Sequence, residues 1–359
     1  MDLINKQKIT AKKYFAITVV LVSAVLATLL ADMQRYVDAP IFGLLFGVII
    51  YNIIPEFHSE FKEGTSFASK KYLSLGIILV GATLNFTQMA ASVRALPLIL
   101  FNICLAFGVA FIFGRFVLKQ SNNICTMVGG GTAICGGTAI ASIGSIIKAN
   151  MGEIGYAITA IFLFDIIACI IYPYIAIALN WTPEQFSYIA GASINNTSSV
   201  TASAVQYASL MGMEMYATGA VTIKLVRTTM LIIVVLAVAL IAFYRQAKNS
   251  AKTQDKANIE FKFGKVFPWF VLGFSAMAVL NTFNLFENSF LSEFFRTGSR
   301  FMITCALVGV GFTMKFKDLF TKGLKPLLLG GCVWFFVAAS TFVFATLMAT
   351  YVNNTRLFG

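Results

Sequence analysis

The sequence predicts an all-α membrane protein that crosses the bilayer many times. Of its 359 residues, 58% are hydrophobic and only 12% are charged, and a water-soluble core could not bury so many apolar stretches. Apolar runs near the length that a helix needs to cross a bilayer, roughly 20 residues, recur along the chain and divide it into about eleven segments. Two of these segments have a composition that predicts broken or re-entrant helices.

Lysine and arginine residues follow the positive-inside rule, which places basic loops in the cytoplasm. Residues 1–14 carry four lysines, so we expect a cytoplasmic N-terminus. Threading the chain from there leaves most of the 27 basic residues in the cytoplasm and the C-terminus outside. The basic residues expected outside are Arg35, Arg94, Arg296, Arg300 and Arg356. The net charge of +12 follows this topology and is not gathered on one segment, so nucleic acid is not an expected partner. The regular spans are expected near residues 15–31, 40–54, 72–88, 96–116, 154–178, 217–244, 266–283, 300–314 and 326–350, with the most basic loop at 245–265.

The first irregular segment, residues 125–148, is apolar but unusually rich in glycine. It contains the run 129–131 and then Gly136 and Gly137, and Thr-Ala follows each group. Glycine in a helix interior costs about 1 kcal/mol relative to alanine, so we expect this cluster to interrupt the helix. Irregular backbone at membrane depth is tolerated only where it is buried in protein or lines a cavity, which makes the segment a candidate substrate site. Close helix packing through small residues is the alternative.

The second irregular segment, residues 191–207, is polar for a membrane element because it carries two Asn and a run of Ser and Thr. We expect helices to start at Gly137-Thr138 and at Thr197-Ser198. Such starts expose backbone N–H groups and hydroxyls, which are donors suited to an oxyanion. The two segments are expected to approach the midplane from opposite faces, either as re-entrant elements or as broken crossing helices.

A short internal similarity predicts an inverted repeat. Residues 81–86 and 311–316 share Gly, Thr and Phe in register, and the charge distribution gives the two spans opposite directions. Opposite directions are what inverted-topology repeats require. We therefore expect residues 1–359 to form one transmembrane unit with a first repeat at 72–178 and a second at 186–350.

Three charged residues fall inside expected spans. Lys224 and Arg227 are three apart and share a helix face, and Asp165 lies in the middle of an apolar span. A charge at the centre of a membrane helix costs about 2.5 to 3.5 kcal/mol, so these side chains should face protein or water. One alternative is a structural ion pair between Asp165 and one of the cations. The other is that a surplus cation binds an anionic substrate, with Asp165 as a candidate coupling group.

Four motifs in order carry a family resemblance: FKEGTSFASKKYLSLGIILVGATLN, AICGGTAIASIGSIIKA, GASI followed by TSSV, and VTIKLVRT. On these the chain resembles the sulfate exporter family of bacterial inner-membrane proteins. That family is itself similar to bile acid:sodium symporters and 2-hydroxycarboxylate transporters. The resemblance implies a secondary transporter in the bacterial inner membrane, with inverted repeats, an elevator-type mechanism and often a homodimer. It maps the substrate site to Gly136, Gly137, Thr138, Ser193, Asn195, Asn196, Thr197, Ser198 and Ser199.

The chain departs from this family at one pair of positions. Members commonly carry His followed by Asp or Glu where this chain has Asn195 and Asn196. Two amides can hydrogen-bond a substrate or coordinate a cation, but they cannot take up a proton at physiological pH.

Other chemistry has little support in the sequence. The six cysteines form no CxxC pair, so no metal site is expected. The sequence has no P-loop pattern and nothing that resembles a nucleophile–base pair, so an enzyme is not expected. We expect no cofactor beyond a coupling Na+ or H+. The alternatives to a carrier of sulfate or a related sulfur oxyanion or sulfonate are a sodium-coupled carrier of a small organic anion and an anion channel.

Overall fold

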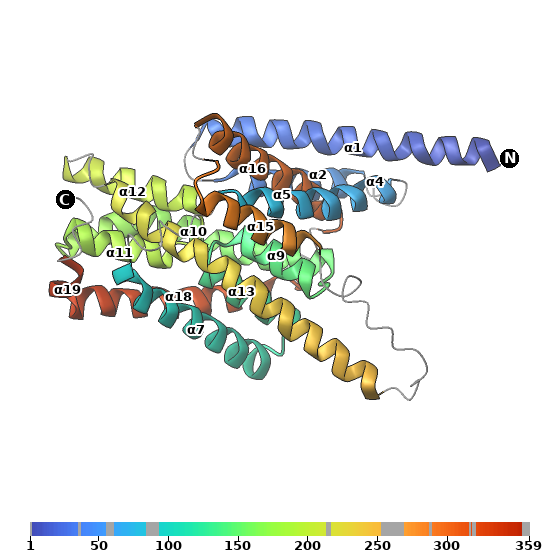
Figure 1. The fold of residues 1–359 in the computed structure, drawn as a ribbon. Helices are drawn as coiled ribbons and strands as arrows, with labels where there is room; N and C mark the ends of the chain where they lie inside the picture. The colour runs from blue at the N-terminus through green and yellow to red at the C-terminus, as the bar shows by residue number, and fades with distance from the viewer. Residues whose placement is uncertain are drawn as a thin grey trace.

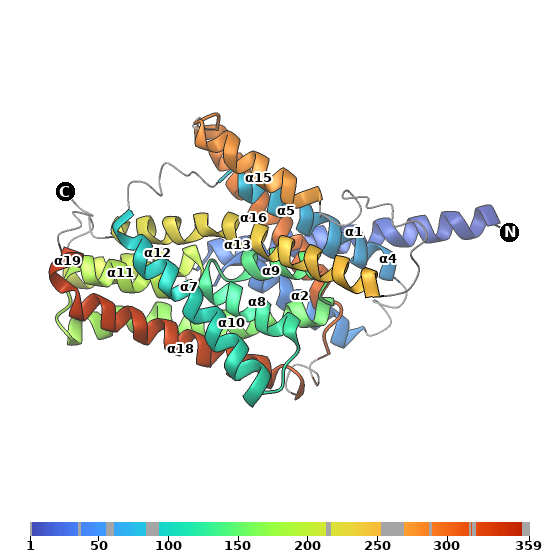
Figure 2. The same ribbon diagram turned by 60° about the horizontal axis from the view of Figure 1, so that its bottom comes forward.

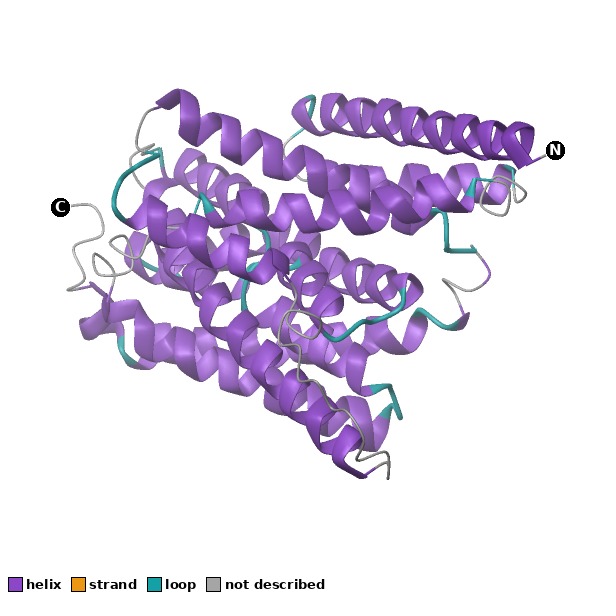
Figure 3. Cartoon of the chain, turned by 45° about the vertical axis from the view of Figure 1, so that its right-hand side comes forward, coloured by secondary structure: helices purple, strands orange, loops and turns teal. Residues whose placement is uncertain are grey.

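The computed structural model describes residues 2–34, 37–54, 61–83, 93–212, 217–252, 269–286, 289–315, 317 and 321–353. These residues form helices and no strand (Figure 3). Within them, five helices are long and apolar enough to span a membrane, and three shorter apolar helices accompany them. The prediction of an all-α polytopic membrane protein is confirmed.

The helices form two bundles that lie side by side (Figure 1). In the first bundle, α16 lies at the centre and packs against α1, α2 and α5, while α15 packs on the far side of α5. The first bundle consists of α1 (Asp2–Asp32), α2 (Ala39–Ile53), α4 (Lys62–Phe67), the π-helical turn η1 (Ala68–Tyr72), α5 (Leu73–Gly81), α15 (Trp269–Thr282) and α16 (Ser289–Gly311).

The second bundle, here called the hairpin bundle, contains both irregular segments. Figure 2 shows α7 and α18 along the side that faces away from α5 and α15, with α8 and α10 packed against them. Its elements are η2 (Val93–Ala95), α7 (Leu96–Phe111), η3 (Ile112–Val117), α8 (Asn122–Ala133), α9 (Gly137–Ile146), α10 (Met151–Ala178), α11 (Pro183–Ser193), α12 (Thr197–Met211), α13 (Ala217–Lys252), α18 (Leu324–Leu347) and α19 (Ala349–Asn353).

The bundles do not coincide with the predicted repeats. The first repeat supplies α5 to the first bundle and α7 to α10 to the hairpin bundle, and the second repeat is divided in the same way. Each predicted repeat therefore contributes to both bundles, and the repeats themselves stay a prediction. The basic loop expected at 245–265 begins later than predicted, because α13 continues through Lys252; residues 253–265 lie outside the described part.

Glycine permits the closest helix contact in the first bundle. A Cβ atom at Gly47 of α2 would overlap the backbone carbonyl of Val308 in α16, and one at Gly311 would overlap the carbonyl of Leu44. Without side chains at these positions the two backbones touch directly, which is how small residues join membrane helices.

This contact can be tested with a pair of alanine substitutions. Gly47→Ala should destabilise the protein by about 1 to 3 kcal/mol, because the added methyl group has no space between the backbones of α2 and α16. Gly108→Ala in α7 is the control, since nothing lies within 4 Å of a Cβ there, and it should be neutral or stabilise by up to about 1 kcal/mol. The thermal unfolding midpoint of the detergent-purified protein measures both. Equal midpoints for the two variants would contradict the close contact.

Candidate functional site

The glycine-rich segment forms a helical hairpin. Helices α8 and α9 pack against each other in antiparallel fashion: Gly131 faces Ile140, Gly130 faces Ile143, and Met127 reaches Gly144. With 12 and 10 residues, they would extend only about 18 and 15 Å at the 1.5 Å rise of an α-helix. The segment therefore folds back on itself, as the re-entrant alternative predicts.

The chain reverses at residues 134–136 and not at the first glycine run. Gly136 has φ +69°, a left-handed conformation that glycine adopts without steric cost. The glycine cluster interrupts the helix as expected, between α8 and α9, while the run 129–131 itself is helical. These glycines are buried against Phe107 and Ala110 of α7 and against α9 and α10, which is the close-packing alternative.

The polar segment forms a second hairpin from α11 and α12. The ring of Phe186 stacks on Tyr207 with centroids 4.0 Å apart, and the Tyr207 hydroxyl donates to the carbonyl of Trp181 at 3.0 Å. Because Phe186 and Trp181 lie near the start of the hairpin and Tyr207 near its end, the two helices run in opposite directions. Helix α12 starts at Thr197, where the sequence predicts a helix start, and continues to Met211, beyond the predicted end of the segment at residue 207.

The two hairpins point toward each other from opposite ends of α10. The open end of the first lies at the start of α10, where Ser121 and Asn123 donate to Glu153. The open end of the second lies just beyond the end of α10, next to Trp181. The tips meet halfway, where a Cβ at Gly136 would lie 3.4 Å from that of Asn195.

Lys224 and Arg227 join the two tips from α13. The Lys224 Nζ donates to the carbonyl oxygens of Ile134 (2.6 Å) and Ile194 (3.1 Å). The Arg227 guanidinium donates to Ala133 (2.8 Å), to Ile194 (2.9 Å) and to the carbonyl of Thr132. These carbonyls end α8 and α11 and have no partner within their helices, and cations are favoured at helix C-termini.

Asp165 has the complementary role at the start of α12. Its Oδ1 accepts the backbone N–H groups of Asn195 (2.6 Å) and Asn196 (3.0 Å). Asp165 is 1% exposed and lies at the middle of α10. In the described part of the chain no ion pair joins it to Lys224 or Arg227, so the ion-pair alternative is not what the structure contains. Its second oxygen, Oδ2, makes no hydrogen bond there, although the Ser199 side chain is close.

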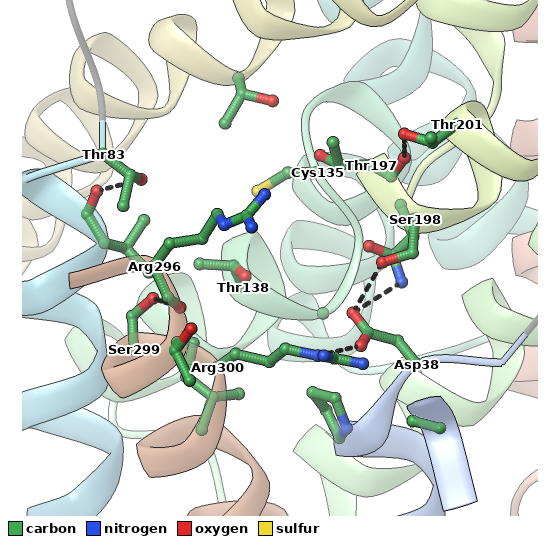
Figure 4. A pocket seen from close by; sticks show the side chains of 18 of the residues that line it. Asp38, Thr83, Cys135, Thr138, Thr197, Ser198, Thr201, Arg296, Ser299 and Arg300 are labelled. Atoms are coloured by element: carbon green, nitrogen blue, oxygen red, sulfur yellow. Dashed lines mark hydrogen bonds and ion pairs between the residues drawn. The ribbon is translucent and has the colours of Figure 1, made fainter. Parts of the chain in front are cut away.

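A cavity of about 1090 Å³ lies between the two bundles in front of the hairpin tips (Figure 4). Several predicted site residues line it, whereas the charged residues of α10 and α13 that bind the tips lie behind the tips, buried in protein. The cavity is lined by the predicted residues Gly137, Thr138, Asn196, Thr197 and Ser198, whereas Gly136, Asp165, Ser193, Asn195, Ser199, Lys224 and Arg227 are not among its lining residues.

The first bundle contributes cavity residues that sequence reasoning missed. Arg300 on α16 binds Asp38 (2.6 Å) and Asp32 (3.2 Å), and Arg296 one turn earlier binds Glu293 (2.7 Å). Both arginines are among the few basic residues that the charge distribution places outside. Their departure from the positive-inside pattern was the signal in the sequence that could have marked them as functional. Which element they would face depends on the packing of the two bundles.

Comparisons with known proteins identify relatives over nearly the whole chain. Residues 15–330 match the family model described as Conserved hypothetical protein 698. A UPF0324 membrane protein of Fusobacterium nucleatum is 33% identical over 341 residues, which cover 91% of this chain and 95% of the relative. One of Clostridium tetani is 32% identical over 345 residues, covering 92% and 96%, and one of Streptococcus pyogenes is 33% identical over 317 residues, covering 88% and 91%. No solved structure matches significantly.

The structural role of the buried cations predicts a large loss of stability on substitution. Arg227→Met removes the donors to Thr132 and Ala133, and each buried carbonyl left without a partner costs about 1 to 3 kcal/mol. Arg115→Met is the control, because Arg115 is exposed and donates only at the surface; its effect should stay within about 0.5 kcal/mol. Thermal unfolding without any added ligand measures both. If the two variants unfolded at the same temperature, the carbonyl contacts would not stabilise the tips.

Proposed function

This chain belongs to the Conserved hypothetical protein 698 family, whose relatives are named UPF0324 membrane proteins, and we propose that it is a secondary transporter of a small anion. The observation that carries the proposal is the pair of hairpins whose tips meet beside a cavity. Transporters commonly build substrate sites from interrupted helices, because the freed helix ends can bind a ligand within the membrane.

The donors around the cavity favour an anion. Helices α9 and α12 both start at its wall, so the positive ends of two helix dipoles are nearby. The side chains of Thr138, Asn196 and Ser198 supply hydroxyl and amide donors. Sulfate, or a related sulfur oxyanion or sulfonate, is the substrate that the resemblance to the sulfate exporter family implies.

The carboxylates of the cavity are held in ion pairs. Asp32 and Asp38 bind Arg300, and Glu293 binds Arg296, so each negative charge has a cation within ion-pair distance. Because two aspartates share Arg300, the three carboxylates face two arginines, and an entering anion must rearrange these ion pairs to bind.

The position of the cavity suggests how access could alternate. It includes Gln34 after α1 and Asn284 after α15, at the end of the first bundle opposite the start of α1 (Figure 1). If the positive-inside orientation holds, this end faces outward. Movement of the hairpin bundle along the first bundle, in an elevator-type mechanism, would carry the tips toward the cytoplasm. The inverted repeat that the sequence predicts would permit such alternation, and we include assembly as a homodimer in the proposal.

A sodium-coupled carrier of a small organic anion is the second candidate. The unbonded Oδ2 of Asp165 favours it, because a buried carboxylate oxygen without a donor is costly unless an ion or proton satisfies it. Ser199 lies beside it and could contribute an oxygen ligand, whereas the Oδ1 of Asn195 already accepts from Arg227 at 3.1 Å. A coupling Na+ or H+ at this position would bind behind the substrate and stabilise the start of α12.

A ligand screen tests the anion proposal. Purified protein is heated with sulfate, sulfite, a sulfonate or a carboxylate, and a ligand at 100 times its Kd should add about 2.7 kcal/mol to the free energy of unfolding. Thr138→Val should weaken this stabilisation by removing a cavity hydroxyl, whereas Thr18→Val on the exposed face of α1 should not. No response to any anion, together with no saturable anion uptake into proteoliposomes, would refute the proposal. Uptake that rises without saturation would indicate a channel.

Sodium coupling makes a separate prediction at Asp165. Na+, compared with an equal concentration of choline, should raise the unfolding midpoint of the wild type and enhance anion binding. Asp165→Asn keeps an oxygen acceptor for the two N–H groups but removes the charge, so it should abolish the Na+ effect. A Na+ response that survives in this variant would exclude Asp165 as the coupling group.

A further inference from the structure

Asp38 is held firmly by the first bundle. It is the residue that precedes α2, and its Oδ1 accepts the backbone N–H of Ala39 at 2.8 Å and the Nε of Arg300 at 2.6 Å. The first contact caps the start of α2, and the second is a charge-assisted bond to α16. One oxygen of the carboxylate is thus fixed by two elements of the same bundle.

The other oxygen of Asp38 reaches the opposite bundle. Its Oδ2 accepts from Asn196 Nδ2 and from Ser198 Oγ, each at 3.3 Å (Figure 4). Both donors lie at the start of α12, on the tip of the second hairpin. The Asp38 side chain is only 13% exposed. A carboxylate of the protein itself therefore occupies the donor-rich end of the hairpin and spans the space between the bundles.

Asp32 provides a natural comparison. It also binds Arg300, at 3.2 Å, and it also lines the cavity. Its side chain is 60% exposed, and its described contacts include none with the hairpins. Both aspartates bind Arg300 and both carry a negative charge, but only Asp38 contacts the proposed substrate site.

We infer that Asp38 is a resident carboxylate that fills the position of the substrate's anionic group, and that the substrate binds by displacing it from Asn196 and Ser198. This inference rests on the proposed function and adds two residues to the site: Asp38 as the group displaced and Arg300 as the cation that the substrate can share. The ligand class is a small carboxylate, sulfonate or oxyanion with at least two oxygens, because one oxygen must face the hairpin donors while another faces the guanidinium.

Displacement also couples binding to movement of the bundles. In the described part of the chain, the bonds from Asp38 to Asn196 and Ser198 are the hydrogen bonds that join α12 to the first bundle. An anion and Asp38 cannot both accept from the same donors, and their like charges repel. Binding therefore breaks this link, and by reciprocity the link opposes binding. The empty carrier would stay in the cavity-open state, and the loaded carrier would be free to move.

The test compares Asp38→Asn with Asp32→Asn, since both remove one negative charge near Arg300. Asparagine is as good a helix cap as aspartate, so α2 should remain intact, and Asp38→Ser is a second variant that also caps. Affinities for sulfate, methanesulfonate and acetate are measured on full-length protein by thermal shift and by calorimetry. We expect Asp38→Asn to bind at least one of these anions tenfold or more tightly than the wild type, and Asp32→Asn to differ from the wild type by less than twofold.

The outcomes separate this inference from the proposed function. If the wild type binds an anion but the two variants change its affinity equally, only the net charge matters and the displacement is refuted while the transporter proposal stands. If Asp38→Asn binds an anion that the wild type does not, the displacement is supported. If no protein binds any anion, both fail. Adding Arg300→Gln to Asp38→Asn should remove the gain in affinity, and a gain that persists would exclude Arg300 from the site.

Discussion

The fold depends on hydrogen bonds to the backbone groups that the two interrupted segments leave unpaired away from water. Two hairpins end in the middle of the molecule, and each leaves carbonyl and N–H groups that no helix can pair. Lys224 and Arg227 supply donors to the carbonyls of residues 132–134 and 194, and Asp165 accepts the N–H groups that precede α12. Charged side chains suit this role because they form stronger hydrogen bonds than neutral ones.

This arrangement separates structural charge from the cavity. The two cations are 0% and 1% exposed, and their donors are directed to the backbone behind the tips and, from Arg227, also to the Oδ1 of Asn195. What faces the cavity is the opposite side of the same tips, where helix starts and hydroxyl groups are available. Ion pairs of the first bundle complete the wall, so the cavity is polar on both sides and its chemistry depends on how the two bundles are aligned.

Several parts of this site could be predicted from residues alone. Gly137 and Thr197 begin helices as expected, and the two segments are irregular as their composition indicates. For the glycine run 129–131, composition alone left two alternatives open, because glycine serves both to break a helix and to let helices approach. Which of these applies depends on whether a neighbour lies against it, and here Phe107, Ile140 and Ile143 do.

Composition, hydropathy and the spacing of basic residues determined that this is an all-α membrane protein with two interrupted segments and buried charges. Those properties are local, since each follows from a window of neighbouring residues and the solvent that surrounds it. Tertiary structure alone decided that the cations bind carbonyls, that Asp38 reaches Asn196, and that Arg300 binds Asp38. These pairs are separated by 30 to 262 residues along the chain, and only the packing of two bundles brings them within hydrogen-bonding distance.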